Sequence, residues 1–280
     1  MRLVIQAHLL ASAHIEVISN LLGTNGFKQL ADNAYATRVS APVPEVAAYC
    51  AEHQIDCAFM QDSHTLDKFG LVVMDMDSTA ITIECIDEVA DMYGLKPQIS
   101  AITESAMRGE IEFAESLRRR VALLAGLDES ALQRVYDERL KLSPGLLQLV
   151  AACKTQGIRT LLVSGGFTFF ADRVKALAGL DYAHSNVLDI ANGKLTGKIV
   201  GDIVDAQAKA DSLTKIRNEL GLTPQQTIAI GDGANDLKMM AAAGIGIAYR
   251  AKPIVQQQAT YALNHSGLDG ALALLTPIAQ

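Results

Sequence analysis

The stretch that most constrains this chain is an apolar run that ends in closely spaced carboxylates. Leu71–Met74 is continuous and apolar, which is typical of a buried strand in a parallel sheet. It is followed by two acids and two hydroxyls: Asp75, Asp77, Ser78 and Thr79. On a strand the two acids point to the same side, and ligands bind at the carboxyl ends of open α/β sheets. Like charges there repel unless a cation such as magnesium lies between them or one is protonated. An Asp-rich turn is the simpler alternative, and the rest of the chain must separate the two.

Composition and charge narrow the class of protein. Half of the 280 residues are hydrophobic, so the chain can bury a sizeable core and disorder is not expected. The net charge of −7 argues against a nucleic-acid-binding surface. No apolar run is long enough to span a bilayer, and the start of the chain does not look like a secretory signal. The 4 cysteines form no C-x-x-C pair, so we expect reduced thiols in a cytoplasmic protein. From the charge and the short apolar runs we expect that it binds neither nucleic acid nor membrane.

Residues 1–66 are predicted to form a small α+β domain. The patterns give the order strand, helix, two strands, helix, strand, over Arg2–Gln6, Ala11–Leu22, Phe27–Ser40, Val43–His53 and Ile55–Met60. This order is ferredoxin-like and resembles the ligand-sensing ACT fold at the level of topology only. A dimerisation or scaffolding module, and hence a homodimer through this domain, is at least as good an interpretation. The polar segment from Asp62 to Lys68 is expected to be a linker.

Residues 67–280 are predicted to form a doubly wound, mostly parallel α/β domain with an inserted helical cap. The strand at Leu71–Met74 is followed by about sixty residues of helical pattern with no further strand, which is too long for a plain crossover. We therefore expect a cap at about 86–140 that covers the end of this strand.

Two later strands also end in polar turns. Ile158–Val163 runs into Ser164, Gly165 and Gly166, whose backbone N–H groups suit an anion, although an ordinary β-to-α turn also uses Ser and Gly. Thr227–Ile230 runs into a Gly-Asp-rich turn that contains Asp232, Asn235 and Asp236. Lys209 lies in the first turn of a predicted helix between them, where a solvated lysine would be the ordinary interpretation. Asn192-Gly193 is a strong hairpin signal between two further predicted strands, Val187–Ile190 and Leu195–Val200.

These motifs together carry a family resemblance. D-x-D-S-T, S-G-G, a lysine and G-D-G-x-N-D, in this order on these elements, resemble the haloacid dehalogenase superfamily of phosphohydrolases. The chain from about Leu71 onward is similar to one family within it, the phosphoserine phosphatases. The matching positions are Asp75–Glu84, Met107, Phe113, Ser116–Val121, Ser164–Phe167, Lys194–Gly197 and Gly231–Asp236. The region before Leu71 is similar, less distinctively, to the ACT-like extension of some bacterial members.

The resemblance implies a role for each catalytic position. Asp75 would be the nucleophile and Asp77 the acid/base. Mg²⁺ would be bound by Asp75, the Asp77 main-chain carbonyl and Asp232, with Asp236 supporting its waters. The groups expected to hold the phosphoryl oxygens are Lys209, Ser164 and the Gly165 N–H, and Asn235 would contact the phosphoryl group or orient its neighbours.

The resemblance also implies the substrate. Glu84 would bind the ammonium and Arg120 the carboxylate of a free amino acid, while Met107 and Phe113 would close an apolar lid. Without the family, a capping carboxylate, a solvated arginine and ordinary cap packing would be preferred. The expected reaction is Mg²⁺-dependent hydrolysis of O-phosphoserine through an aspartyl-phosphate, the last step of serine biosynthesis. A phosphotransferase to an alcohol such as homoserine, and an amino-acid-sensing regulatory protein, are the alternatives.

Overall fold

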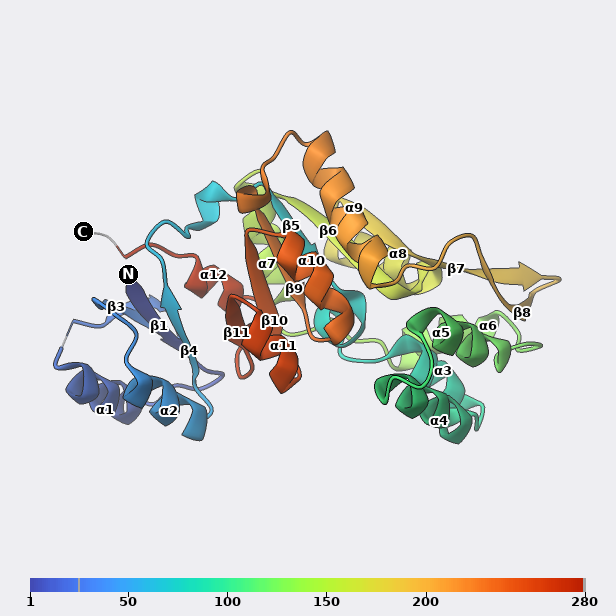
Figure 1. Cartoon of the computed structure of the whole chain (residues 1–280), viewed down its shortest axis with the longest axis horizontal. Helices are drawn as coiled ribbons and strands as arrows, with labels where there is room; N and C mark the ends of the chain where they lie inside the picture. Colours follow the sequence, from blue (N-terminus) through green and yellow to red (C-terminus); the bar gives the residue numbers. More distant parts are fainter. Residues whose placement is uncertain (25, 279–280) are drawn as a thin grey trace.

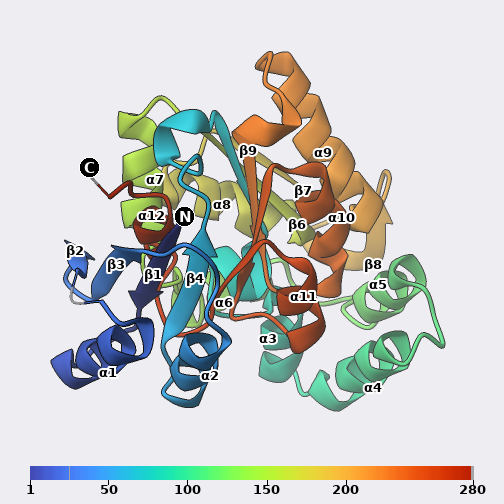
Figure 2. The ribbon, with the colours of Figure 1, turned by 60° about the vertical axis from the view of Figure 1, so that its left-hand side comes forward.

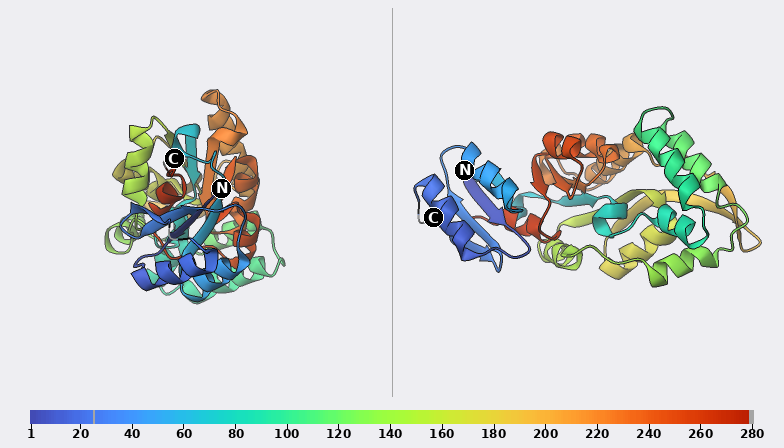
Figure 3. Two further views of the ribbon diagram at one scale, coloured as in Figure 1. Left: turned by 90° about the vertical axis from the view of Figure 1, so that its left-hand side faces the viewer. Right: turned by 90° about the horizontal axis from the view of Figure 1, so that it is seen from below.

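The computed structural model describes residues 1–24 and 26–278, which form two sheets and their helices (Figure 1). The smaller sheet has four strands and the larger has seven. The views in Figures 1 and 3 place the smaller sheet at one end of an elongated molecule, the larger sheet in the middle and a helical cap at the other end. The predicted fold class, a mostly parallel α/β sheet with an inserted cap and a small antiparallel α+β unit before it, is confirmed. None of the helices in the described residues is both long and apolar enough to cross a bilayer.

The N-terminal unit has the predicted order of elements. Its elements are β1 (Arg2–Gln6), α1 (Ser12–Leu22), β2 (Lys28–Ala31), β3 (Ala34–Arg38), α2 (Pro44–Glu52) and β4 (Asp56–Met60). The strands pair antiparallel in the order β2-β3-β1-β4. Leu3 and Ile5 pack with the helices on one face, whereas Val4 on the other face belongs to the core of the larger unit. A boundary at residue 66 stays a prediction, because the two units share this core.

The large sheet positions the polar strand ends. Its strands are β5 (Leu71–Met74), β6 (Arg159–Phe167), β7 (Tyr182–Ala191), β8 (Lys194–Val200), β9 (Thr227–Gly231), β10 (Ile245–Tyr249) and β11 (Tyr261–Leu263). They lie in the order β11-β10-β9-β5-β6-β7-β8, and all neighbours are parallel except β7 and β8. β5 is therefore central, with β9 on one side and β6 on the other.

Helices cover both faces of this sheet, because β5 places apolar side chains on both faces. Val72 and Met74 face one core and Leu71 and Val73 the other, because successive side chains of a strand point to opposite faces. The first core also contains residues of α7 (Leu146–Thr155), α8 (Thr168–Ala178) and α12 (Gly270–Leu274). The second contains residues of α9 (Ala206–Glu219), α10 (Leu237–Ala242) and α11 (Pro253–Gln258).

The cap consists of four short helices that follow β5. They are α3 (Cys85–Met92), α4 (Lys96–Met107), α5 (Phe113–Ala122) and α6 (Ser130–Glu138). The β7–β8 hairpin reaches out from the sheet and packs along α5 (Figure 1). Gly126 N donates to Leu195 O and Leu195 N donates to Leu127 O, both at 2.8 Å. The hairpin therefore ties the cap to the core.

Two strand predictions were too short. β6 was expected to stop at Val163, but it continues to Phe167, with an irregular register beyond Val163, because the small residues Ser164 to Gly166 remain extended. β7 begins at Tyr182, and its first half pairs parallel with β6 before its second half forms the predicted hairpin. Polar residues in this first half, such as His184 and Ser185, hid its strand pattern.

The two units meet where β1 lies beside α12 (Figure 2). Polar contacts that sequence reasoning missed join them there. Asp56 is 4% exposed, and its carboxylate accepts hydrogen bonds of 2.6 to 3.2 Å from the backbone N–H groups of Asn264, His265 and Ser266. Arg2 is 1% exposed and donates to the backbone carbonyls of His64 and Leu274 at 2.6 and 2.8 Å. Since buried polar groups must be paired, these side chains fix how the small sheet meets the large unit.

We expect Asp56→Ala to lower the free energy of unfolding by about 2–4 kcal/mol, because it leaves three backbone donors without an acceptor. The measurement is chemical denaturation monitored by circular dichroism. Asp62→Ala is the matched control: this side chain is 52% exposed, it pairs with the partly exposed Met1 and the exposed Arg38, and it lies 3.9 Å from the buried Arg2, whose backbone partners are kept. It should therefore cost below about 1 kcal/mol. Equal losses in the two variants would contradict this account of the junction.

Candidate active site

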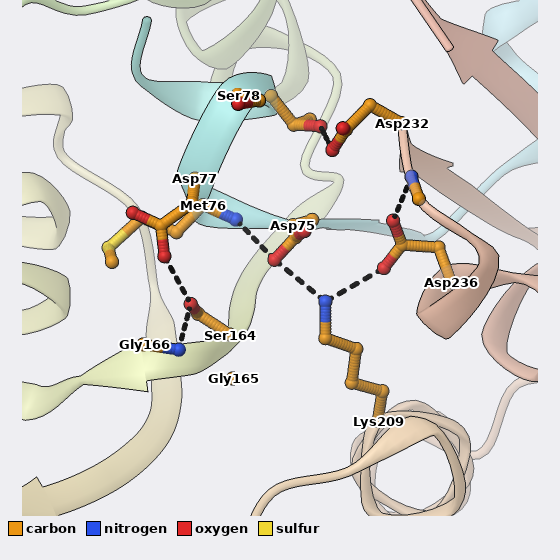
Figure 4. Close-up of polar contacts among 12 residues, drawn as sticks. Asp75, Met76, Asp77, Ser78, Ser164, Gly165, Gly166, Lys209, Asp232 and Asp236 are labelled. Atoms are coloured by element: carbon orange, nitrogen blue, oxygen red, sulfur yellow. Dashed lines mark hydrogen bonds and ion pairs between the residues drawn. The ribbon is translucent and has the colours of Figure 1, made fainter. Parts of the chain in front are cut away.

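The acidic strand ends predicted from the sequence meet in the structure. β5 and β9 are parallel neighbours, so Asp75 after β5 and Asp232 after β9 lie at the same edge of the sheet. β6 is the neighbour on the other side and brings Ser164 to the same edge (Figure 4). Parallel strands align their carboxyl ends, which explains why residues far apart in the sequence converge here.

A single wide turn after β5 separates the two aspartates. The turn, Met76–Ala80, is closed by Ala80 N to Asp75 O and Ile81 N to Met76 O, and Ser78 adopts a left-handed φ of 56° within it. The Asp77 carboxylate is thereby directed away from Asp232 and toward β6 (Figure 4). It accepts hydrogen bonds from Cys85 N at 3.0 Å and Ser164 Oγ at 3.4 Å. Burial raises the pKa of Asp77, which favours its protonated form as an acid.

Lys209 is the centre of the buried charge cluster. It is 1% exposed, and its ammonium lies 2.7 Å from Asp75 Oδ1 and 2.8 Å from Asp236 Oδ1 (Figure 4). Burial alone would lower the pKa of Lys209, but the charges of Asp236 and Asp75 outweigh it and raise that pKa. The ordinary interpretation of this residue as a solvated helix lysine is wrong.

Three carboxylates gather where a divalent cation would fit. One oxygen each of Asp75, Asp232 and Asp236 lies within 4.8 Å of the others. Burial, followed by the charge of Asp236, raises the pKa of Asp75 well above its usual range and that of Asp232 to about 6. A cation would relieve this unfavourable concentration of negative charge, and carboxylate oxygens are hard ligands. The side chain of Asp77 is not part of this set, which leaves its main-chain carbonyl as the expected ligand.

A cavity of about 620 Å³ lies between this edge of the sheet and the cap. Seven of the eight positions expected to hold substrate line it, namely Glu84, Met107, Phe113, Arg120, Ser164, Gly165 and Asn235, whereas the eighth, Lys209, does not. Asp75, Asp77 and Asp232 line it from the core, whereas Lys209 and Asp236 lie behind its wall. The cavity therefore brings the expected catalytic and recognition residues to one space.

The cap contributes two carboxylates and one guanidinium to this cavity. Ser78 Oγ donates to Glu84 Oε1 at 2.6 Å, and burial and the charge of Asp77 raise the pKa of Glu84 to about 7. The Arg120 Nε is buried and has no hydrogen-bond partner among the described residues. A buried guanidinium without a partner is costly unless a ligand supplies the acceptor. Asp87 also lines the cavity and its charge opposes the lowering of the Arg120 pKa by burial.

The apolar side of the cavity is partly formed. Phe113 lies directly over Gly165, because a Cβ on that glycine would come within 2.9 Å of the Phe113 ring. Met107 lines the cavity but is 66% exposed, so it does not cover the site in this structure. Asn235 lines the rim without a hydrogen bond to another site residue among those described.

Three supporting residues were not assigned a role from the sequence. Thr79 Oγ1 donates to Asp232 Oδ1 at 3.1 Å, Ser78 orients Glu84, and the backbone of Cys85 binds Asp77. The two hydroxyls belong to the D-x-D-S-T motif. Their partners lie on other turns, so only the fold reveals them.

Comparisons with known proteins agree with this geometry. The family model of haloacid dehalogenase-like hydrolases matches residues 69–244. A phosphoserine phosphatase from Polaromonas sp. is 53% identical over 215 residues, which span 75% of this chain and 91% of that protein. The solved structure of a probable phosphoserine phosphatase from Vibrio cholerae, in unliganded form, is 40% identical with a TM-score of 0.87, covering 98% of this chain and 86% of that one. A phosphoserine phosphatase solved as a phospho-aspartyl intermediate analogue is 36% identical with a TM-score of 0.70, covering 74% and 99%.

The chain therefore belongs to the haloacid dehalogenase-like hydrolases, whose sheet and acidic strand ends it has. Within them it is a member of the phosphoserine phosphatase family, as its identity to the curated relatives requires. Phosphatases of this superfamily use a metal ion, and the three-carboxylate cluster suits one.

We expect Gly166→Ala to lower kcat about tenfold or more, because a Cβ there would come within 2.6 Å of Asp77 Oδ2 and displace it. Turnover of any accepted phosphate ester measures this. Gly193→Ala is the control, since it strains a positive φ of 74° in the distant hairpin turn and should affect stability alone. Unchanged kcat in Gly166→Ala would show that Asp77 tolerates the shift and would contradict the prediction.

Proposed function

We propose that this protein is a Mg²⁺-dependent phosphoserine phosphatase, which converts O-phosphoserine and water to serine and phosphate through a phosphorylated aspartate. The observation that carries the proposal is a single cavity lined by Asp75 and Asp77 on one side and by Glu84 and Arg120 on the other. The first pair suits phosphoryl transfer, and the second pair suits the ammonium and carboxylate of a free amino acid.

In the first half-reaction, an Asp75 carboxylate oxygen attacks phosphorus and the bond from phosphorus to the seryl oxygen breaks. Asp77 gives its proton to the departing oxygen, so that neutral serine hydroxyl leaves. The raised pKa of Asp77 supports this role as an acid. Ser164 and the Gly165 N–H are proposed to hold the phosphoryl oxygens, and Lys209 holds Asp75 in place through the 2.7 Å ion pair.

In the second half-reaction, water attacks phosphorus of the phosphorylated Asp75. Asp77, now a carboxylate, takes the proton of this water, the acyl–phosphate bond breaks, and phosphate leaves. Asp75 is restored as a carboxylate and Asp77 as an acid. The hydrogen bonds from Cys85 N and Ser164 Oγ keep Asp77 in one position for both proton transfers.

Mg²⁺ is the metal we propose for the carboxylate cluster. It would be held by Asp75, Asp232 and the Asp77 carbonyl, with Asp236 supporting its waters, and would neutralise the charge that otherwise repels the phosphoryl oxygens. Removal of the metal with a chelator should abolish turnover, and Mg²⁺ should restore it.

The N-terminal unit is proposed to pair two copies of the chain, and the protein to act in the cytoplasm. β2 is an edge strand whose outer side is open to a second chain among the described residues. The 4 cysteines are free, as in a reducing compartment. Analytical ultracentrifugation of the whole chain tests the dimer.

We expect Asp75→Asn to abolish turnover, by a factor of about 10⁴ or more, because the amide is no nucleophile. The measurement is phosphate release from O-phosphoserine and a panel of small phosphate esters, with and without Mg²⁺. Wild-type rates should be highest for O-phosphoserine and depend on the metal. Unchanged turnover in Asp75→Asn would overturn the mechanism, and a phosphorylated product on addition of homoserine would favour the phosphotransferase alternative.

We expect kcat/KM for O-phosphoserine to fall as the pH drops below about 7, since a carboxyl whose pKa is raised to about 7 loses its charge there and can no longer bind an ammonium. An aryl phosphate without an amino group should not share this loss. The measurement is the pH profile of the ratio of the two kcat/KM values. Glu84→Gln should flatten the ratio, and an unchanged profile in this variant would contradict the role of Glu84.

A further inference from the structure

More carboxylates than cationic side chains line the substrate cavity. Five carboxylates line it and two cations face it, namely Asp75, Asp77, Glu84, Asp87 and Asp232 against Arg120 and Lys252. A phosphoserine carries a phosphate charge of about −1.5 to −2 at neutral pH, in addition to its carboxylate and ammonium. With a divalent cation on Asp75 and Asp232 and a proton on Asp77, Glu84 and Asp87 are the acids that still oppose the approach of such an anion.

The other two cations near the site are assigned to other partners, Lys209 to buried carboxylates and Arg120 to the substrate carboxylate. Lys209 is buried behind the wall of the cavity, and its ammonium is bound by Asp75 and Asp236. Arg120 comes from the cap, where it is suited to the substrate carboxylate. Lys252 is therefore the cation that the core side presents to the cavity, and no ion pair or hydrogen bond engages its ammonium within the described part of the chain.

The backbone of Lys252 is held beside the acidic strand ends. Its N–H donates to Asp232 O at 3.4 Å, and Lys252 immediately precedes α11, whose first residue is Pro253. Two residues earlier, Arg250 has a φ of 47° and its N–H donates to Leu263 O at 2.7 Å. The loop after β10 is thus fixed at both sides, whereas the exposed lysine side chain stays free to meet a ligand.

We propose that Lys252 is a substrate-capturing residue that draws the phosphate end of the substrate into this carboxylate-lined cavity. The inference rests on the proposed phosphatase activity and adds a residue to it. An ammonium on a flexible stem acts as a point charge, without the fixed geometry of a guanidinium. Its effect falls on substrate capture and weakens with salt, and kcat is unaffected.

The experiment compares Lys252→Gln, Lys252→Arg and Lys28→Gln with the wild type, at saturating Mg²⁺ and over a range of ionic strength. Lys28 is an exposed lysine of β2, in the N-terminal unit, so its variant makes the same change in net charge without altering the cavity. At about 0.01 M salt, where the screening length is ~30 Å, Lys252→Gln should lower kcat/KM about three- to tenfold with kcat unchanged. The difference should shrink as salt rises, Lys252→Arg should keep most of the wild-type value, and Lys28→Gln should match the wild type.

Each contrary result overturns the proposal. Unchanged kcat/KM in Lys252→Gln at low salt, a loss that salt does not reduce, or a loss confined to kcat would each do so. The half-saturating Mg²⁺ concentration and the melting temperature should be unchanged, since the backbone bond to Asp232 is kept; a shift in either would assign the loss to metal binding or folding instead. An aryl phosphate dianion is tested in parallel. If the wild type hydrolyses it but not O-phosphoserine, the proposed substrate fails while the test of Lys252 still stands.

Discussion

The ion pairs of Lys209 hold the rest of this site together. A lysine that is 1% exposed is stable only with carboxylates in contact, and Asp75 and Asp236 at 2.7 and 2.8 Å supply them from the ends of two different strands. The same contacts keep two acids side by side that would otherwise repel each other. The arrangement fixes the nucleophile, leaves Asp232 toward the cavity, and requires that β5, β9 and α9 pack in one particular way. The same buried charge cluster therefore positions the catalytic residues and constrains how the core packs.

Much of the core and its site could be predicted, because the relevant information is local. The apolar run before Asp75 predicts a buried strand, and the acid that follows it predicts a ligand site at the end of that strand. The same reasoning applies to β9 and Asp232. The junction between the two units could not be predicted. Asp56 and Ser266 lie 210 residues apart, and nothing near either residue signals that a carboxylate will meet backbone N–H groups. The extended course of Ser164 to Gly166 was also missed, since small residues fit a turn and a bulged strand equally well.

Chemistry and selection are divided between the core and the cap. The core supplies rigid strand ends that hold Asp75 and Asp77, whereas Glu84 directly precedes α3 and Arg120 lies on α5 of the cap. The β7–β8 hairpin connects the two, because it starts beside β6 and ends against α5. Met107 remains 66% exposed, so the apolar side of the cavity is only partly covered in this structure. This division lets the recognition surface change while the reacting groups stay fixed.

The way the small sheet is anchored has a consequence for how the chain emerges from the ribosome. The backbone groups that satisfy Asp56 are made 208 to 210 residues after it. At roughly 5–20 residues per second, this is a wait of roughly 10–40 s during translation. Throughout that interval β1 and β3, whose Val4 and Ala36 belong to the shared core, lack the α12 residues that contact them. Until synthesis reaches α12, the nascent N-terminal unit therefore carries an apolar face that only the completed chain buries.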